Sequence, residues 1–355
     1  MSHHHTHMSH HHRESVLFIG TPSVTLALRL FRRIIYNNVF FPYLKDNNIE
    51  NVIHLGDVVD RRKFINFNIL HKFKKDFIGW FQDNEVNMHI IIGNHDTYFK
   101  NTNAVNAMDE LIDFNHPYSP KVYSEPDTLN FEGREIVLMP WINSENYHSS
   151  SDYIKNSNSK VLFGHLEIAG FEMHRGMKCE EGLGIKMFDK FDLVCSGHFH
   201  HKSNNGKIHY LGNPYETTWM DYDDPKGFHI FDTETLELEF IQNPYKMFHK
   251  IEYDEDVVVD TSDMDGRYVK IVVKNRTNAL KFDIFLDTLY KNNVADIQIV
   301  ESNDEFDSSG EDVDVIQDTM TLLSEYVDNY EMSLDKMKLK SMIKDLYVDA
   351  IRENA

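Results

Sequence analysis

Four short stretches of the sequence share one design, in which an apolar run leads into glycine and then into aspartate, asparagine or histidine. They are VIHLGDVVDRR (Val52 to Arg62), HIIIGNHD (His89 to Asp96), KVLFGHLEIAG (Lys160 to Gly170) and FDLVCSGHFHH (Phe191 to His201). Short apolar runs of this kind predict buried strands. Glycine lets the backbone approach a ligand closely, or take a conformation that a Cβ forbids. The design therefore places polar side chains just beyond four strand ends.

The carboxyl ends of strands in an open α/β sheet converge at one edge, so residues far apart in sequence can meet there. The residues that we expect to converge are Asp57, Asn94, His95, His165, His198 and His200. Carboxylate, amide oxygen and imidazole form a mixed set that suits manganese, iron or zinc better than calcium or the soft metals. Each residue alone has an ordinary structural explanation, and the combination is what predicts a metal site.

The spacing also suggests individual roles. His198 and His200 are two positions apart, which on a continuing strand puts both on one face, so that each can serve one of two neighbouring metals. Asp57 is our candidate bridge between two cations about 3.5 to 4 Å apart, which together activate water and stabilise a phosphoryl displacement. We assign His95 and Asp96 as catalytic, with His95 off the metals and donating a proton or hydrogen bond to the leaving oxygen.

These stretches resemble the motifs of the calcineurin-like metallophosphoesterases. GDVVDRR resembles that family's GDxxDR, GNHD its GNH[DE], the Gly-His pair at 164–165 its lone GH, and GHFH its GHxH. More narrowly, roughly Asn51 to Pro244 is similar to the SbcD-type DNA double-strand-break repair nucleases and their T-even phage homologues. A Ser/Thr phosphatase would show Arg-Gly after GDxxD and Glu after GNH, where this chain has Arg61-Arg62 and Asp96.

The resemblance implies an α/β (α+β) fold, a two-sheet β-sandwich flanked by helices with a small α/β capping domain and C-terminal helices. It implies Mn²⁺ as cofactor, one ion on Asp57, Asn94, His165 and His198, and another on Asp57, His200 and two ligands of a first motif, GDxH. We assign Arg61 and Arg62 to substrate binding.

The first motif departs from the family pattern. In VLFIGTPSVT, Thr21 stands where the family has aspartate and Ser23 where it has histidine. Neither residue is a good metal ligand at neutral pH, so two ions are expected for the family and one is possible here. Sequence error, a local frameshift and true decay of the motif all explain the departure.

The resemblance further implies a DNA exonuclease and endonuclease subunit that acts on DNA ends. It would work with an SbcC-type coiled-coil ATPase in DNA recombination, repair and replication, and as a homodimer. Two alternatives stay open: a catalytically impaired scaffold that still binds DNA ends and the ATPase, and a phosphodiesterase or phosphatase for small substrates.

The order of elements fits such a fold. VLFI reads as a strand, Thr25 to Leu44 and Asn66 to Asn84 as helices, and Gly227 to Ile241 as a hairpin. Strands that alternate with helices and then follow one another predict a sheet sandwich with flanking helices.

Composition divides the chain into five segments. We expect a disordered His-rich tail at 1–13, a nuclease domain at 14–244, a DNA-binding capping domain at 245–300, an acidic linker at 301–315 and C-terminal helices at 316–355. The apolar faces of the last two helices fit either a helix pair folded on its own domain or a docking element for the partner.

Length, composition and net charge limit the class of protein that this chain can be. A chain of 355 residues with 41% hydrophobic content can build a core in two or three domains. The formal charge of −21 argues against a broad electrostatic grip on a phosphate backbone, although basic residues cluster near 29–33 and 60–63. Two cysteines, Cys179 and Cys195, make no disulfide framework. With no membrane span and no signal peptide recognisable, we expect a cytoplasmic protein, in the host cell if it is phage-encoded.

Overall fold

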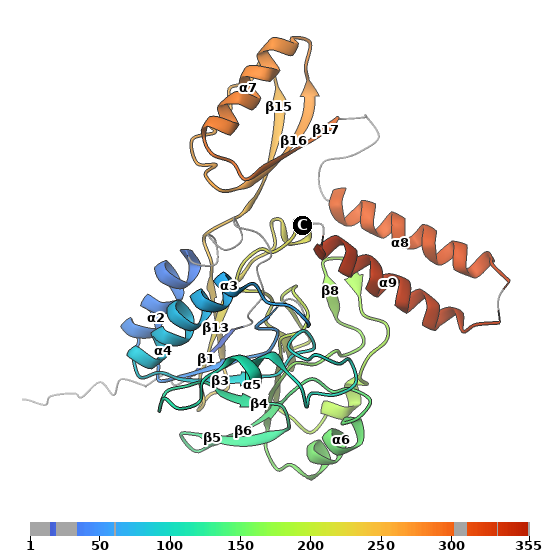
Figure 1. Ribbon diagram of the computed structural model, residues 1–355. Coiled ribbons are helices and arrows are strands. Elements are labelled where there is room, and N and C mark those ends of the chain that lie inside the picture. The colour runs from blue at the N-terminus through green and yellow to red at the C-terminus, as the bar shows by residue number, and fades with distance from the viewer. Residues whose placement is uncertain (1–14, 19–33, 60–61, 302–310, 332, 354–355) are drawn as a thin grey trace, which may run out of the picture.

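The computed structural model describes residues 15–18, 34–59, 62–301, 311–331 and 333–353. In this part of the chain, two six-stranded sheets carry helices on their outer faces, and a smaller sheet with its own helix stands apart from them (Figure 1). The predicted two-sheet sandwich with flanking helices is confirmed.

The first sheet has the strand order β14-β13-β1-β2-β3-β4. Its strands are β1 (Ser15–Phe18), β2 (Asn51–His54), β3 (Asn87–Ile91), β4 (Lys121–Tyr123), β13 (Gly227–Phe231) and β14 (Leu238–Gln242). Strands β1 to β4 run parallel, which brings their carboxyl ends to one edge. The strands β13 and β14 pair antiparallel and confirm the predicted hairpin.

The second sheet has the order β11-β12-β10-β7-β6-β5. Its strands are β5 (Asp127–Phe131), β6 (Arg134–Met139), β7 (Val161–Gly164), β10 (Leu193–Ser196), β11 (Ser203–Asn204) and β12 (Ile208–Tyr210). Strands β6, β7, β10 and β12 are parallel. The short pair β8 (Glu172–His174) and β9 (Met177–Lys178) lies in the connection after β7.

Alternation along the strands builds the core on both sides of each sheet. In the first sheet, Ile53 packs in the cluster between the sheets, whereas its neighbour Val52 packs against the outer helices. In the second sheet, Phe163 faces the cluster between the sheets and Leu162 faces outward. Each strand is therefore apolar on both faces, which explains why the sequence shows unbroken apolar runs instead of a polar alternation.

Helices on the outer face of the first sheet are continuous over several assigned segments. One runs through η1 (Tyr36–Phe40) and α2 (Phe41–Asp46), and another through α3 (Phe67–Lys72), η2 (Phe73–Ile78) and α4 (Gly79–Asp83). The side chain of Asn66 caps the second helix by accepting from two backbone N–H groups. The prediction from Asn66 to Asn84 is confirmed; of the helix predicted from Thr25 to Leu44, residues 25–33 lie outside the described residues.

Shorter helices complete the sandwich. They are α5 (Ala107–Leu111), α6 (Tyr147–Asn156), η3 (Ile185–Phe188) and η4 (Trp219–Asp221). Both cysteines are buried and free, as expected. In the described part of the chain, none of the helices combines the length and the apolar character needed to cross a bilayer.

The segment expected as a capping domain forms a parallel three-stranded sheet with one helix. Its elements are β15 (Phe248–Asp254), β16 (Tyr268–Asn275), α7 (Ala279–Lys291) and β17 (Asp296–Glu301). They enclose a separate small core that includes Tyr253, Ile271 and Phe282.

The chain ends in a helical hairpin of α8 (Glu311–Asn329) and α9 (Lys336–Glu353). The first helix begins at Glu311, earlier than the boundary of 316 that we expected. The rest of the expected linker, 302–310, lies outside the described residues. Val348 of α9 packs against Met177 and Met220 of the sandwich.

Candidate metal centre

Glycines allow the four strand ends to approach one another. Gly56 has φ of 95° and Asp57 φ of 56°, so the chain turns sharply after β2. A Cβ on Gly93 would lie 2.3 Å from Oδ1 of Asp57, and one on Gly197 would lie 2.5 Å from the carbonyl oxygen of Leu55. These loops can pack together only because glycine precedes each polar residue.

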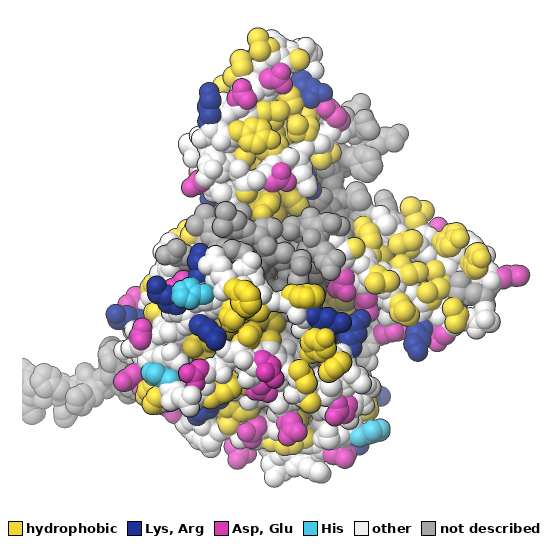
Figure 2. Space-filling view, viewed as in Figure 1, with side chains coloured by type: hydrophobic (Ala, Val, Ile, Leu, Met, Phe, Trp, Pro, Cys, Tyr) yellow, Lys and Arg dark blue, Asp and Glu magenta, His cyan; other side chains and the backbone are white. Residues whose placement is uncertain are grey.

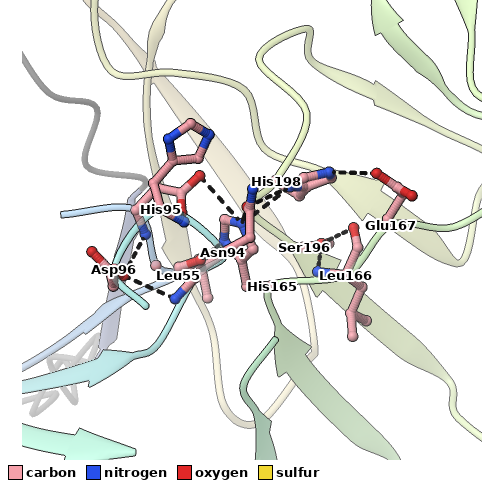
Figure 3. Close-up of polar contacts among 12 residues, drawn as sticks. Leu55, Asn94, His95, Asp96, His165, Leu166, Glu167, Ser196 and His198 are labelled. Carbon is pink, nitrogen blue, oxygen red and sulfur yellow. Dashed lines mark hydrogen bonds and ion pairs between the residues drawn. The ribbon is translucent and has the colours of Figure 1, made fainter. Parts of the chain in front are cut away.

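Side chains from both sheets converge at this edge. Oδ1 of Asn94 lies 2.9 Å from Nε2 of His165 and 3.1 Å from Nδ1 of His198. The two imidazole nitrogens are 3.1 Å apart, and Oδ2 of Asp57 lies 3.3 Å from Nε2 of His165. Figure 3 shows Asn94, His165 and His198 pointing toward one another, with Glu167 beyond His198.

The second nitrogen of each histidine fixes its tautomer. Nδ1 of His165 lies 2.7 Å from the carbonyl oxygen of Leu55, which can only accept, so this nitrogen carries the proton. Nε2 of His198 is held in the same way by the carboxylate of Glu167 at 3.0 Å. The lone pairs of the other two nitrogens then point at the oxygens of Asp57 and Asn94. Four acceptor atoms gathered in this way call for a cation.

The donor set fits a divalent transition metal. Two ligand atoms about 2.2 Å from one ion and at right angles to each other are about 3.1 Å apart, close to the spacings found here. Among the described residues, the acidic, histidine and cysteine side chains whose ligand atoms gather within 4.8 Å of one another are Asp57, His165 and His198.

Charges in the cluster favour binding. Burial tends to raise the pKa of Asp57, but the neighbouring His165 and His95 lower it more, so the pKa of this carboxyl lies well below its usual range. Burial lowers the pKa of His198 and keeps that ring neutral. Burial also disfavours protonation of His165, but Asp57 raises the pKa of His165 above its usual value. A cation on the cluster would compete with that proton, so binding becomes weaker as the pH falls.

The two residues that we expected to be catalytic differ in their surroundings. His95 is partly exposed, and its backbone N–H donates to Oδ1 of Asp57 at 2.8 Å. Asp96 is fully buried, and its carboxylate accepts from the N–H groups of Asp57, Val59 and Gly93 at 2.8 to 3.1 Å. Asp96 therefore clamps the two loops of the first sheet together, and its expected catalytic role stays a prediction.

His200 was expected to lie on one strand face with His198. The premise that the strand continues through this residue is wrong, because β10 ends at Ser196 and the chain bends from His198 onward. The ring of His200 packs against that of His174, with the centroids 5.6 Å apart. The group of Asp57, His165 and His198 does not include it, and its role as a ligand of a second ion stays a prediction.

The sequence is similar to several known proteins. The sequence profile of the calcineurin-like phosphoesterases matches residues 25–202. The chain belongs to this family. It is 33% identical over 312 residues to exonuclease subunit 1 of Enterobacteria phage T4, an alignment that covers 87% of this chain and 90% of that protein. It is also 27% identical over 166 residues to the SbcD component of the SbcCD nuclease of Staphylococcus epidermidis, covering 43% and 42% of the two chains. A third relative, the same component of the SbcCD nuclease of Staphylococcus saprophyticus, is 24% identical over 208 residues, or 57% and 49%.

Some of the sites expected for this phosphoesterase cannot be placed. Arg61 lies outside the described residues, as do Thr21, Ser23 and the tail at 1–13. Arg62 is half-buried and donates from Nη1 to Oγ1 of Thr97 at 3.0 Å, close in sequence to Asn94.

Sequence reasoning missed two contacts of the phosphoesterase centre. Glu167 follows His165 by two residues, and its role as a partner of His198 was not inferred from that spacing. The ring of Trp141, which follows β6, lies 5.1 Å from the His198 ring and 6.0 Å from the His165 ring. The stretch IVLMPWI (Ile136 to Ile142) lies within the range that resembles the SbcD-type nucleases, and its proline-tryptophan pair was the available signal.

Proposed function

We propose that this phosphoesterase is the Mn²⁺-dependent nuclease subunit of a DNA-processing complex, hydrolysing phosphodiester bonds at DNA ends. One observation carries the proposal. Acceptor atoms of Asp57, Asn94, His165 and His198, which come from both sheets, form one cluster in which neighbouring atoms are 2.9 to 3.3 Å apart. The phage relative that aligns with 87% of the chain is named as an exonuclease subunit, which supports DNA as the substrate.

The chain's own residues have distinct tasks in this proposal. Asp57, Asn94, His165 and His198 hold a divalent ion, which when bound supplies Lewis-acid chemistry to a phosphodiester. His95, partly exposed beside Asp57, donates a proton or hydrogen bond to the leaving oxygen.

The number of ions depends on the first motif. A second ion would require Asp57, His200 and two further ligands, and the positions of those ligands, Thr21 and Ser23, lie outside the described residues. We propose that the four-residue set binds one ion by itself. Repairing the motif with Thr21→Asp and Ser23→His should then add a second ion and raise nuclease activity.

The helical hairpin offers a surface for the SbcC-type ATPase. Val348 and Val327 are buried, whereas Leu322, Tyr326 and Leu346 are each about two-thirds exposed, at 65 to 67%. Figure 2 shows hydrophobic side chains gathered on this hairpin. An amphipathic helix pair with one face on its own domain and the other face open can receive a partner helix. The helix pair therefore packs on its own domain through one face, and we propose that the other face docks the partner.

Two further proposals concern a homodimer interface and a DNA-contacting domain. Large aromatic side chains that follow Asp57 and Asn94 in the sequence by ten residues or fewer are exposed, namely Phe64 at 77%, Phe67 at 86% and Phe99 at 49%, which supports a homodimer formed through this region. We also assign DNA contact to the capping domain, because its sheet and helix form a separate unit that stands apart from the two large sheets (Figure 1).

Cleavage of linear DNA tests the proposed function. The chain should degrade DNA ends with Mn²⁺ and lose this activity with a chelator or on His198→Ala, because one of four ligands is removed. The matched control is His148→Ala, since His148 is an exposed histidine of α6 away from the centre.

Two results would replace the proposal. DNA-end binding without cleavage at any Mn²⁺ concentration would identify a scaffold. Turnover of a chromogenic phosphodiester with no activity on DNA would identify a small-substrate phosphodiesterase.

A further inference from the structure

A buried lysine connects the two sheets beside the metal centre. Lys226 is 4% exposed and immediately precedes β13 of the first sheet. Its Nζ donates at 2.7 Å to the backbone carbonyl of His200, in the loop that follows β10 of the second sheet. A lysine buried to this degree is rare, because removing the ammonium from water is unfavourable unless nearby anions compensate for it.

Two buried aspartates supply that compensation. Nζ of Lys226 lies 3.0 Å from Oδ1 of Asp221 and 3.1 Å from Oδ2 of Asp224. Oδ2 of Asp221 is itself fixed, because it accepts at 2.8 Å from both the backbone N–H and the hydroxyl of Thr217. Burial tends to lower the pKa of Lys226, but the two aspartates raise it above its usual value, so the ammonium is retained. The two aspartates therefore hold the ammonium of Lys226 in place.

The same network reaches the next residue of the loop. Oδ1 of Asp224 lies 3.0 Å from Nδ1 of His201, and Nε2 of His201 lies 3.3 Å from Oε2 of Glu172 on β8. The carbonyl of His200 also accepts from the N–H of Asn213 at 3.2 Å. The loop is thus fastened at 200 and 201, and at its other end by β10.

His198 lies between these two anchors. Its partners in the cluster divide between the sheets: Asn94 follows β3 of the first sheet, whereas His165 follows β7 of the second. Any sliding of one sheet on the other would change the spacing of the ligand atoms. The ammonium of Lys226 links the start of β13 to the His198 loop. It therefore opposes movement of that loop relative to the first sheet, and so preserves the spacing of the ligand atoms.

We infer that Lys226 is a positioning residue for the metal centre, holding the His198 loop in register with Asp57 and Asn94 through the carbonyl of His200. The inference rests on the proposed metal-dependent function. It does not place Lys226 in contact with metal or substrate.

Lys226→Met, compared with Lys190→Met, tests this role. Lys190 is a matched control, because its Nζ also donates to backbone carbonyls, at 2.7 Å to Ile154 and 3.0 Å to Lys155, but at the end of α6. We expect both variants to lower the melting temperature. Only Lys226→Met should weaken Mn²⁺ binding in calorimetry, by about 10- to 100-fold, the range for residues that orient metal ligands.

A second variant keeps the test decisive if Lys226→Met does not fold. Asp224→Asn leaves the Lys226–Asp221 pair intact but weakens the anchors on Lys226 and His201, and it should lower Mn²⁺ affinity by roughly 3- to 10-fold. If both variants fold, Mn²⁺ affinity equal to wild type in both would overturn the inference. If only Asp224→Asn folds, wild-type Mn²⁺ affinity in that variant would overturn it. Failure of the wild-type chain to bind Mn²⁺ would overturn the proposed metal centre itself, and that outcome is distinguishable from the first.

Discussion

Gly93 gives the sharpest test of how the centre is built. A Cβ at this position would lie 2.3 Å from Oδ1 of Asp57, 2.4 Å from its backbone nitrogen and 2.9 Å from Cε1 of His165. Ordinary contacts between such atoms begin at about 3.3 to 3.5 Å, so Gly93→Ala must move the carboxylate of Asp57 by about 1 Å. The atoms that this Cβ would meet are the carboxylate and backbone nitrogen of Asp57 and the ring of His165. None of them is the free end of a flexible side chain.

Two effects follow from that displacement. Overpacking of a buried site costs about 1 to 3 kcal/mol, which in a domain of this size lowers the melting temperature by roughly 3 to 10 °C. Because Asp57 is a proposed metal ligand, a shift of about 1 Å should also reduce catalysis by about 100-fold. We would measure Mn²⁺ affinity by calorimetry, DNA cleavage at saturating Mn²⁺ and thermal unfolding of the same samples.

Gly184→Ala is the control. Gly184 has φ of −67° and ψ of 134°, which alanine adopts readily, and no heavy atom lies within 4 Å of the added Cβ. We expect its stability to stay within about 1 kcal/mol of wild type and its Mn²⁺ affinity to be unchanged. Wild-type Mn²⁺ affinity and cleavage in Gly93→Ala would refute the close approach of the two loops on which the site depends.

Three further predictions follow from other contacts. Glu167→Gln should weaken Mn²⁺ binding about 10-fold, since the amide can present an N–H to His198 and favour the wrong tautomer; unchanged affinity in calorimetry would show that Glu167 does not fix that ring. Burial lowers the pKa of His89 to about 4 from 6.5, so the unfolded chain takes up the proton first as the pH falls, and at most about 3 kcal/mol of stability is lost between these values. His89→Asn, which can keep a hydrogen bond to Tyr123, should make denaturant unfolding less dependent on pH in that window, and an unaltered pH profile would contradict this. Leu322→Asp should abolish binding to the SbcC-type partner in a pull-down while DNA cleavage by the isolated chain persists; retained binding would remove the hairpin as the docking surface.

The sequence determined the strands and the chemistry at their ends. Apolar runs such as VIHL and HIII specify strands buried on both faces, because a sheet covered by helices on one side and by a second sheet on the other has no polar face. Glycine followed by Asp57, Asn94, His165 or His198 was readable because the residue types needed to bind a metal are few. The helix from Asn66 to Asn84 was readable for a local reason, since its cap and its apolar spacing lie within one segment.

Only the tertiary structure decided which neighbours each of these residues has. His200 has the right type and spacing, but β10 ends at Ser196, so strand spacing does not fix the direction of this side chain, and its ring packs against His174. The motif places Asp96 beside His95, and only the structure shows that three backbone N–H groups enclose its carboxylate. The physical reason is that spacing along a chain fixes a side chain's direction only while regular structure continues, whereas contacts such as that of Lys226 with His200 exist only after two sheets have packed.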